Sequence, residues 1–278
     1  MSERTQHVLA FYSRHPISAE HIIARLEADR GRLTDLGPET LFTYDQDHYG
    51  GLEANDALAQ RAHLKPGMHV ADFCAGLGGP ARYLAAKYGV HVVGVELNPH
   101  RVAGANQLNQ LVGMTDKVNM LQGDVTDVDM PDASVDAVIS QEALLHVPDK
   151  AKALREAHRI LRPGGRLVFS DWVVHRPLAP EDVESMWNGI AAQDLQSIPG
   201  YVERLKEARF TVEQQEDLTA AWAVILAERF EMYKKLRAET KKAGKPSGDD
   251  AFYESYARLV ALVQAGDLGG GRFTALKG

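Results

Sequence analysis

The stretch HVADFCAGLGGPARYLA, residues 69–85, decides the fold, because a short apolar run passes through a glycine-rich turn into a segment with helical character. The run HVADF has the composition of a buried strand, and Gly76, Gly78 and Gly79 permit a turn in which a ligand can approach the backbone closely. In open α/β folds, ligands bind where such a turn follows a strand at the carboxyl edge of a parallel sheet. The stretch therefore predicts a strand, a ligand-binding turn and a helix.

The alternation of apolar runs and helical segments continues from residue 67 to about residue 169. Further strands are predicted at residues 91–97, 118–124, 135–141 and 166–172, with helices at residues 80–88, 99–113 and 150–165 between them. Such alternation predicts βαβ units and a parallel sheet with helices on both faces. We expect a sixth strand near Phe210 and a seventh near Phe273, which gives an α/β fold with a seven-stranded, mostly parallel sheet.

These patterns divide the chain into four parts. Residues 1–55 are predicted to form an N-terminal helical lid, and residues 56–219 the ligand-binding core, with a substrate-facing insertion at 176–200. Residues 220–268 are predicted to form a helical cap of two helices, separated by KKAGKPSGDD (241–250), and residues 269–278 the final strand.

Composition narrows the classes of function. The net charge of −7, without a long Lys/Arg run, argues against a nucleic-acid partner, which usually requires a clustered basic surface. A single cysteine, Cys74, excludes an intramolecular disulfide and a Cys-rich zinc site, and the scattered histidines show no metal-ligand spacing. No apolar run approaches the ~20 residues that span a bilayer, and no signal-peptide core is found. We expect a cytoplasmic protein that acts on a small molecule, without a metal or a membrane partner.

Acidic residues follow successive predicted strands and indicate what the turn holds. Asp72 ends the first strand, Glu96 the second and Asp124 the third, and Gln141 and Glu142 follow the fourth. An acid about twenty residues past the turn suits a ribose diol. An acid at the end of the first strand would repel a pyrophosphate but suits an ammonium or a sulfonium. The spacing also lacks the Lys-Ser/Thr of a triphosphate loop, so a positively charged nucleoside is the predicted ligand.

Four motifs, DFCAGLGG (72–79), VVGVEL (92–97), QGDV (122–125) and LRPGGRLVFSD (161–171), resemble those of class I S-adenosylmethionine-dependent methyltransferases. The segment SQEALLHVPDKAKALREAHRILRPGG (140–165) resembles the small-molecule branch, which includes sarcosine/dimethylglycine N-methyltransferases, phosphoethanolamine N-methyltransferases and cyclopropane-synthase-like enzymes. One departure is Cys74, which stands where the first glycine of the family's turn usually stands. The resemblance implies a Rossmann-like fold and an enzyme that converts S-adenosyl-L-methionine to S-adenosyl-L-homocysteine.

The resemblance also implies which residues bind the cofactor. Asp72 and the backbone from Ala75 through Gly76 to Gly78 would meet its amino-acid end. Glu96 would bind the ribose hydroxyls, and Gln141 would lie near the sulfonium. The adenine would be held by Leu97, Asp124 and Val125. Although any one of these acids alone could cap a helix or be a solvated loop residue, acids at successive strand ends favour the cofactor interpretation.

Candidates for the substrate end lie in segments that the motifs do not explain. The catalytic candidates are His48, Tyr49, Glu142 and His146, where His146 is a base or substrate ligand or, alternatively, a structural histidine. The substrate-binding candidates are Tyr44 in the predicted lid, Trp172 and His175 after the fifth strand, and Trp222 on an apolar helical stripe that forms either core or pocket wall.

Several functions remain open at this point. N-methylation of a small amine is expected first, because the loop after the fourth strand resembles amine-methylating relatives. C-methylation of an isoprenoid or lipid is the main alternative, with a carboxylate such as Glu142 or Glu184 beside a developing cation, and O-methylation of a small metabolite is another. A protein that retains the cofactor without chemistry is a further hypothesis. A homodimer is also open, because exposed and buried apolar stripes look alike in sequence.

Overall fold

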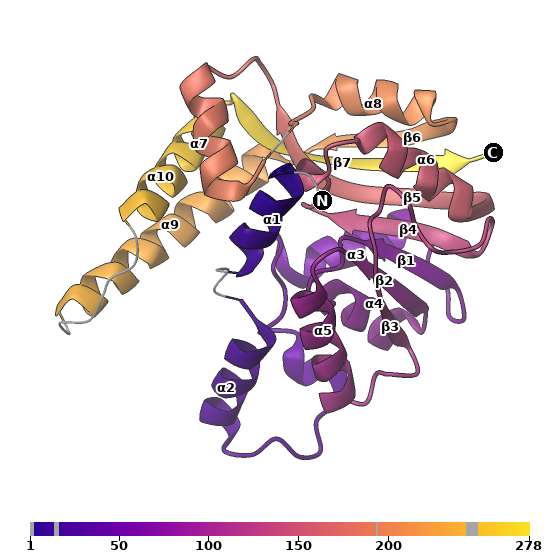
Figure 1. Cartoon of the computed structure of the whole chain (residues 1–278), viewed down its shortest axis with the longest axis horizontal. Coiled ribbons are helices and arrows are strands. Elements are labelled where there is room, and N and C mark those ends of the chain that lie inside the picture. The colour runs from indigo at the N-terminus through magenta and orange to yellow at the C-terminus, as the bar shows by residue number, and fades with distance from the viewer. Residues whose placement is uncertain (1–2, 14–16, 193, 243–249) are drawn as a thin grey trace.

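The computed structural model describes residues 3–13, 17–192, 194–242 and 250–278, which build one seven-stranded sheet flanked by helices (Figure 1). The strands are β1 (His69–Phe73), β2 (His91–Glu96), β3 (Val118–Gln122), β4 (Val135–Gln141), β5 (Leu161–Val174), β6 (Phe210–Asp217) and β7 (Leu268–Lys277). Every predicted strand is present. The segment predicted to separate the two last helices lies largely outside the described residues, at 243–249.

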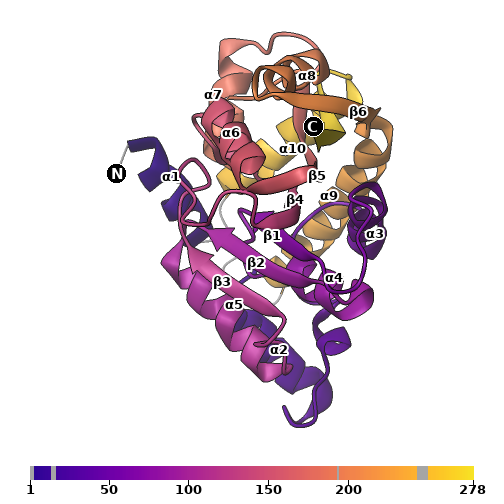
Figure 2. The same ribbon diagram turned by 90° about the vertical axis from the view of Figure 1, so that its right-hand side faces the viewer.

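The strand order is β3-β2-β1-β4-β5-β7-β6. Figure 2 shows β3, β2, β1, β4 and β5 following one another across the sheet. The first five strands pair in parallel, whereas β7 runs antiparallel between β5 and β6. The expected α/β class with a mostly parallel sheet is confirmed. The order reverses direction between β1 and β4, and this topological switch point is where open α/β sheets bind ligands.

Helices cover the two faces of the sheet because successive side chains of each strand point to opposite sides. On one face lie α2 (Ala19–Arg30), the 3₁₀ turn η1 (Pro38–Leu41), α3 (Gly51–Arg61), α4 (Gly79–Tyr88) and α5 (Pro99–Leu111). On the other lie α6 (Lys150–Ile160) and α8 (Ile198–Glu207). Val70 and Ile139 pack into the core under the first group, and their neighbours Ala71 and Val138 into the core under the second.

A third core joins the C-terminal helices to the antiparallel side of the sheet. It is formed by α7 (Pro180–Ile190), α9 (Thr219–Lys242) and α10 (Asp250–Gln264), and Figure 1 shows α9 and α10 side by side, projecting from the body. Helix α9 sits unusually close to β7, because a Cβ atom at Gly269 or Gly270 would collide with Thr219 or Trp222. These two glycines therefore allow the first turn of α9 to pack directly on β7.

The first helix, α1 (Glu3–Ser13), lies near the carboxyl ends of the strands together with the 3₁₀ turn η2 (Leu144–His146). The His7 ring stacks on Trp187 of α7 with ring centroids 4.0 Å apart, and its Nε2 donates to the Trp187 carbonyl at 3.0 Å. Helix α1 is thus held by a helix that lies far away in the sequence.

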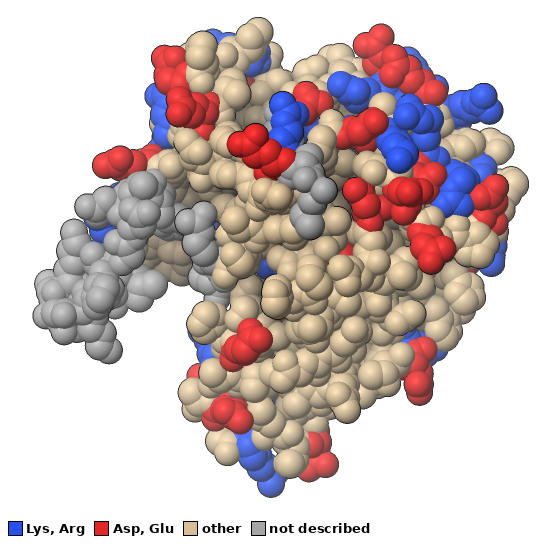
Figure 3. All heavy atoms as spheres, in the orientation of Figure 1, with Lys and Arg blue, Asp and Glu red and all other residues tan. Residues whose placement is uncertain are grey.

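Acidic and basic side chains lie intermixed on the face shown in Figure 3, and they gather over α6 and α8. Fewer charged side chains lie over the middle of this face. Among the described residues, no helix combines the length and apolar character that crossing a bilayer requires.

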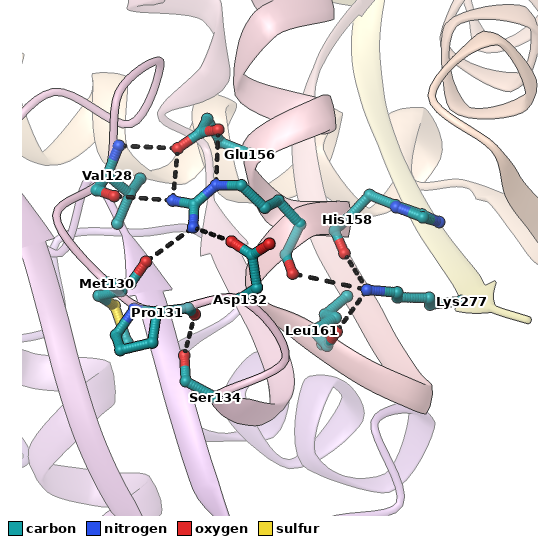
Figure 4. A network of polar contacts seen from close by, with 10 residues as sticks. Val128, Met130, Pro131, Asp132, Ser134, Glu156, His158, Leu161 and Lys277 are labelled. Carbon is teal, nitrogen blue, oxygen red and sulfur yellow. Dashed lines mark hydrogen bonds and ion pairs between the residues drawn. The ribbon is translucent and has the colours of Figure 1, made fainter.

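A polar network ties the loop after β3 to α6 and to the end of β7 (Figure 4). Arg159 of α6 donates to the carbonyl oxygens of Val128 and Met130 at 2.8 and 2.7 Å, and it pairs with Glu156 and Asp132. Lys277 donates to the carbonyl oxygens of His158 and Leu161 at 2.7 and 2.6 Å. The network holds in place a loop that begins at residues 124 and 125, two of the predicted adenine contacts.

Candidate active site

A pocket of about 1130 Å³, including its open mouth, lies at the carboxyl ends of β1, β2 and β4. One side is built by the glycine turn and the strand ends. The other is built by α1, the segment before Tyr49, and the loop after β4.

The glycine turn adopts left-handed backbone conformations at three positions. Cys74, Gly76 and Gly78 have φ angles of 59°, 56° and 75°. Cys74 therefore adopts, with a side chain, a conformation that favours glycine, as expected where the family's turn usually has one. At Gly79, a Cβ atom would collide with the carbonyl oxygen of Asp45, so only glycine lets the N-terminal segment cross the start of α4.

Glu96 joins the turn to the end of β2. Its carboxylate accepts hydrogen bonds from the Gly76 amide at 2.9 Å and from the Asn98 amide at 2.8 Å, and the residue is 8% exposed. A carboxyl group that accepts from two backbone amides is held in one orientation while it lines the pocket. The group is placed to accept hydrogen bonds from a ligand diol.

Asp72 is a buried carboxyl group without a complete set of partners. It is 4% exposed, and its Oδ2 atom has no hydrogen-bond partner although it lines the pocket. Burial, with the negative charge of Glu96 in addition, raises the pKa of Asp72 to about 8. An unpartnered buried carboxyl group is costly unless a ligand completes it, so Asp72 fits an ammonium group.

Asp124 and Val125 follow β3 at the same edge. Asp124 Oδ1 accepts from the amide and the hydroxyl of Thr126, both at 2.8 Å, while Val125 is buried. Leu97 lies on the pocket wall after β2. Of the predicted cofactor residues, the structure brings the following to the pocket: Asp72, Ala75, Gly76, Glu96, Leu97, Asp124, Val125 and Gln141. Gly78 is not among the pocket-lining residues, because it faces Arg82 and Met120 within the turn.

Helix α1 forms a wall of the pocket that the sequence did not assign residue by residue. Its Val8, Leu9 and Tyr12 line the pocket, and the Tyr12 hydroxyl lies 2.8 Å from His146 Nε2. His146 Nδ1 lies 3.1 Å from the Ala191 carbonyl, so Nδ1 is the donor and Nε2 accepts from Tyr12. His146 thus reaches the pocket, with both ring nitrogens engaged. The apolar spacing at residues 8–12 was the only sequence signal for this wall.

Arg101 of α5 is a second pocket residue that the sequence did not single out. Its guanidinium lies 4.8 Å from the centre of the Tyr12 ring, and it pairs with Asp47 at 3.0 Å. These contacts link α5, α1 and the segment before Tyr49 around the pocket mouth. The only sequence signal was a basic residue just inside a helix, which is common on protein surfaces.

Glu142 and His48 both line the pocket, and both contact the backbone of Tyr49. Glu142 has a φ angle of 52°, and both its carboxylate oxygens accept from the Tyr49 amide, at 3.1 and 3.0 Å. Burial raises the pKa of Glu142. Burial also lowers the pKa of His48 to about 4, so this ring is neutral at pH 7 and donates through Nε2 to Gln46 Oε1 at 3.0 Å. Burial therefore favours the neutral form of both side chains on this wall: it raises the pKa of Glu142 and lowers the pKa of His48.

The remaining candidates lie outside the pocket lining. Tyr49, Trp172 and Trp222 form an aromatic cluster, with the Tyr49 ring centre 5.6 Å from that of Trp172 and 5.0 Å from that of Trp222. The Tyr44 hydroxyl donates to Asp29, and His175 Nε2 lies 2.8 Å from the Thr219 hydroxyl. None of these five candidates lines the pocket. Only the Tyr49 amide, through Glu142, is connected to it.

The described residues contain no group of three or more His, Cys, Asp or Glu side chains placed to hold a metal ion. What the pocket can hold is set by its charges. Six acids line it, Asp45, Asp47, Asp72, Glu96, Asp124 and Glu142, against one arginine, Arg101. Of these acids, Asp45 is paired with Arg82 and Asp47 with Arg101. Within the described part of the chain, the lining acids without a cationic partner are Asp72, Glu96, Asp124 and Glu142, and they favour a ligand that carries positive charge.

Comparison with known proteins agrees with this geometry. Residues 71–169 match the methyltransferase domain family. Phosphoethanolamine N-methyltransferase 1 of Arabidopsis thaliana is 32% identical to the chain over 67% of this chain and 37% of the relative. A sterol 24-C-methyltransferase of Gibberella zeae is 33% identical over 59% of this chain and 44% of the relative.

A solved structure shares the fold. Phosphoethanolamine N-methyltransferase 2 of Haemonchus contortus, in complex with phosphomonomethylethanolamine and S-adenosylhomocysteine, superposes with a TM-score of 0.75 and 23% identity. The superposition covers 96% of this chain and 59% of that chain. The chain spans less than half the length of the first curated relatives it matches. The resemblance drawn from the sequence motifs is confirmed by these matches.

Proposed function

Because the chain carries a methyltransferase domain of the class I S-adenosylmethionine-dependent type, we propose that it methylates a small molecule and that the methylated atom is an amine nitrogen. The supporting observation is the buried Glu142 carboxyl group at the substrate end of the pocket. The pocket supplies further carboxylates for the cofactor, and Glu142 is left to face the second ligand.

The residues present fit S-adenosylmethionine. The unpartnered Oδ2 of Asp72 suits the ammonium, the fixed carboxylate of Glu96 suits the ribose diol, and Asp124 lies beside the buried Val125 for the base. When bound, this cofactor supplies a methyl group on a positively charged sulfur.

The protein's own part in methyl transfer is alignment and exclusion of water. Val8 and Leu9 of α1 present apolar surface to the pocket, and the neutral His48 adds no charge to it. Glu142 can accept an N–H hydrogen bond from a neutral amine, and it faces the positive charge that methylation creates on nitrogen. The nitrogen that attacks must be neutral, because a protonated amine has no free lone pair, so the reacting end of the substrate is a neutral amine.

The proposal is tested by incubating the purified protein with donor carrying a labelled methyl group and a panel of amines, phenols and prenyl compounds. Product mass and label position identify the methylated atom. Transfer to an amine supports the proposal, and transfer only to a carbon or oxygen atom overturns the nitrogen assignment. Glu142→Gln, which keeps the shape but removes the charge, should lower kcat by about 100-fold. Exposed Glu184→Gln on α7 is the matched control.

C-methylation of an isoprenoid or lipid is the second candidate. It is favoured by the aromatic cluster of Tyr49, Trp172 and Trp222, which adjoins Glu142 through the Tyr49 amide. Aromatic rings and a carboxylate can together stabilise a carbocation, which here requires the three rings, now outside the pocket lining, to come into contact with the substrate. If this candidate is correct, Tyr49→Leu should damage turnover of prenyl compounds far more than their binding.

We further propose that residues 1–55 act as a lid and residues 220–268 as a cap over a core at 56–219 that carries a substrate-facing insertion at 176–200. We place the enzyme in the cytoplasm, acting on a free small molecule and not on nucleic acid, which the net charge of −7 supports. Light scattering of the purified protein tests the homodimer that the sequence leaves open.

A further inference from the structure

Helix α9 carries one side chain from the cap to the segment that lines the pocket. Trp222 and Leu226 are buried in the third core, and Arg229 follows them by seven and three residues, on the same face of the helix. Gly269 and Gly270 of β7 let the start of α9 pack directly against the sheet. The packed face of α9 therefore determines where Arg229 lies relative to the sheet.

Arg229 contacts two consecutive residues of the pocket segment. Its Nη2 atom donates to the His48 carbonyl oxygen at 3.0 Å, and its Cζ atom lies 4.6 Å from the centre of the Tyr49 ring. The chain separation between Arg229 and His48 is 181 residues. A planar guanidinium can make the hydrogen bond and the ring contact together, which a lysine ammonium does less well.

The same segment leads directly to Glu142. The Tyr49 amide donates to both carboxylate oxygens of Glu142, and Glu142 itself is held in the left-handed region with a φ angle of 52°. Such a conformation persists in a residue with a side chain only when its surroundings hold it. The Tyr49 amide is one such contact, and the backbone bond from the Glu142 amide to the Ser170 carbonyl at 2.7 Å is another.

We propose that Arg229 is a positioning residue of the active site: it fixes the His48–Tyr49 backbone and, through the Tyr49 amide, the Glu142 carboxylate at the substrate end. The inference rests on the proposed function for its role in turnover, but not for its effect on Glu142. Through Arg229, helix α9 takes part in the reaction although none of its described residues lines the pocket.

The groups around Glu142 act on its pKa in opposite directions. Asp171 of β5 and Asp47 of the N-terminal segment add to the burial that raises the pKa of Glu142, whereas the Tyr49 amide and Arg229 oppose it. Among the described residues, no carboxylate forms an ion pair with Arg229, so its charge is not cancelled by a partner of its own. Arg229 therefore also favours the ionised form of Glu142.

The test compares Arg229→Met, which keeps the apolar stem, with Arg229→Lys, which keeps the charge. Lys235→Met removes an exposed charge from the same helix and is the control. The Glu142 carboxyl is titrated by carbon-13 NMR in protein labelled at glutamate, and its signal is assigned by its loss in Glu142→Gln. Near-ultraviolet circular dichroism, which reports on Trp172 and Trp222, checks that each variant is folded.

Arg229→Met should shift the Glu142 titration to higher pH and lower kcat by between about 10-fold and 100-fold, with little change in KM for the donor. Arg229→Lys should restore the titration but only part of kcat, and the Lys235→Met control should change neither. A folded Arg229→Met protein with an unchanged titration and kcat overturns the inference. If Arg229→Met does not fold, an Arg229→Lys protein with the full wild-type kcat overturns it. If the wild type methylates no amine, the proposed function fails, while the titration still decides the link between Arg229 and Glu142.

Discussion

Arg82 and Asp45 form an ion pair in which neither side chain has any exposed surface, with Nη2 and Oδ2 2.9 Å apart. The guanidinium also donates to the Leu77 carbonyl at 2.6 Å and to Asn109 Oδ1 at 2.8 Å. The pair therefore joins the N-terminal segment to the helix behind the glycine turn. It explains why the chain before Tyr49 crosses the glycine turn at a fixed place.

Breaking this pair should destabilise the protein strongly. Arg82→Met or Asp45→Asn each leaves a buried group without its partner, and we expect a loss of about 3–5 kcal/mol in the free energy of unfolding. The double variant should lose less than the sum of the two, because it leaves no unpaired charge. Urea denaturation measures all three. Strictly additive losses would show that the two side chains do not act as a pair.

Removing the acids at the ends of β2 and β3 should weaken donor binding. Glu96→Ala should reduce the affinity for S-adenosylmethionine by about 10- to 100-fold, because hydrogen bonds to a charged group contribute ~1.5–3 kcal/mol. Asp124→Ala should cost less, because Asp124 is exposed. Calorimetric titration measures both, with exposed Asp129→Ala as the control. Full affinity in folded Glu96→Ala and Asp124→Ala proteins would contradict the placement of the cofactor.

The pH dependence of stability should report on Asp72. Burial, and secondarily Glu96, raises the pKa of Asp72 from 3.8 to about 8, so the folded protein holds a proton that the unfolded chain releases. The contribution of Asp72 to the stability of the ligand-free protein is therefore greatest below pH 4, and it is lost as the pH rises toward 8. Asp72→Asn, which cannot ionise, should be more stable than wild type at pH 8, with a melting temperature a few degrees higher.

Donor binding should follow the opposite course over the same pH range. The ionised form of Asp72 attracts an ammonium, so the affinity of the wild type for S-adenosylmethionine should rise from pH 6 to pH 8, and that of Asp72→Asn should not. Thermal melts and calorimetry at each pH measure the two effects. Parallel pH profiles for the two proteins would show that Asp72 does not titrate in this range.

The Tyr12 hydroxyl should help to hold α1 on the pocket. Tyr12→Phe removes the hydrogen bond to His146 Nε2 but keeps the ring under the Arg101 guanidinium. We therefore expect the free energy that holds α1 against the pocket to fall by about 1 kcal/mol. Amide hydrogen exchange in residues 3–13 should become about fivefold faster, while exchange in α4 stays the same. Unchanged exchange in α1 would show that the hydroxyl does not contribute to its docking.

Much of the core could be predicted from sequence because its signals are local. Each strand alternates with a helix, and the acids Asp72, Glu96 and Asp124 stand at strand ends that parallel pairing brings to one edge. Once the sheet was inferred, the turn and these acids had to lie near one another. The cofactor end of the pocket follows from that register.

The pocket wall opposite the strand ends was harder to predict because distant segments build it. Tyr12 and Arg101 were missed, since one lies in an apolar helical pattern and the other looks like a surface cation. Conversely, Trp172 and Trp222 were candidate substrate contacts, yet both are buried in the third core. Helical spacing shows that a face is apolar, but not whether a strand or a ligand covers it.

The sequence alone determined the order of strands and helices, the glycine turn and the carboxylates beside it, because chain periodicity and strand direction fix these within a few residues of each motif. Only the tertiary structure decided that α1 closes the pocket, that Tyr49 meets it through its amide, and that Arg229 reaches His48 across 181 residues. The physical reason is that such contacts depend on how separate helices pack, and packing is set by shape and burial summed over the whole chain.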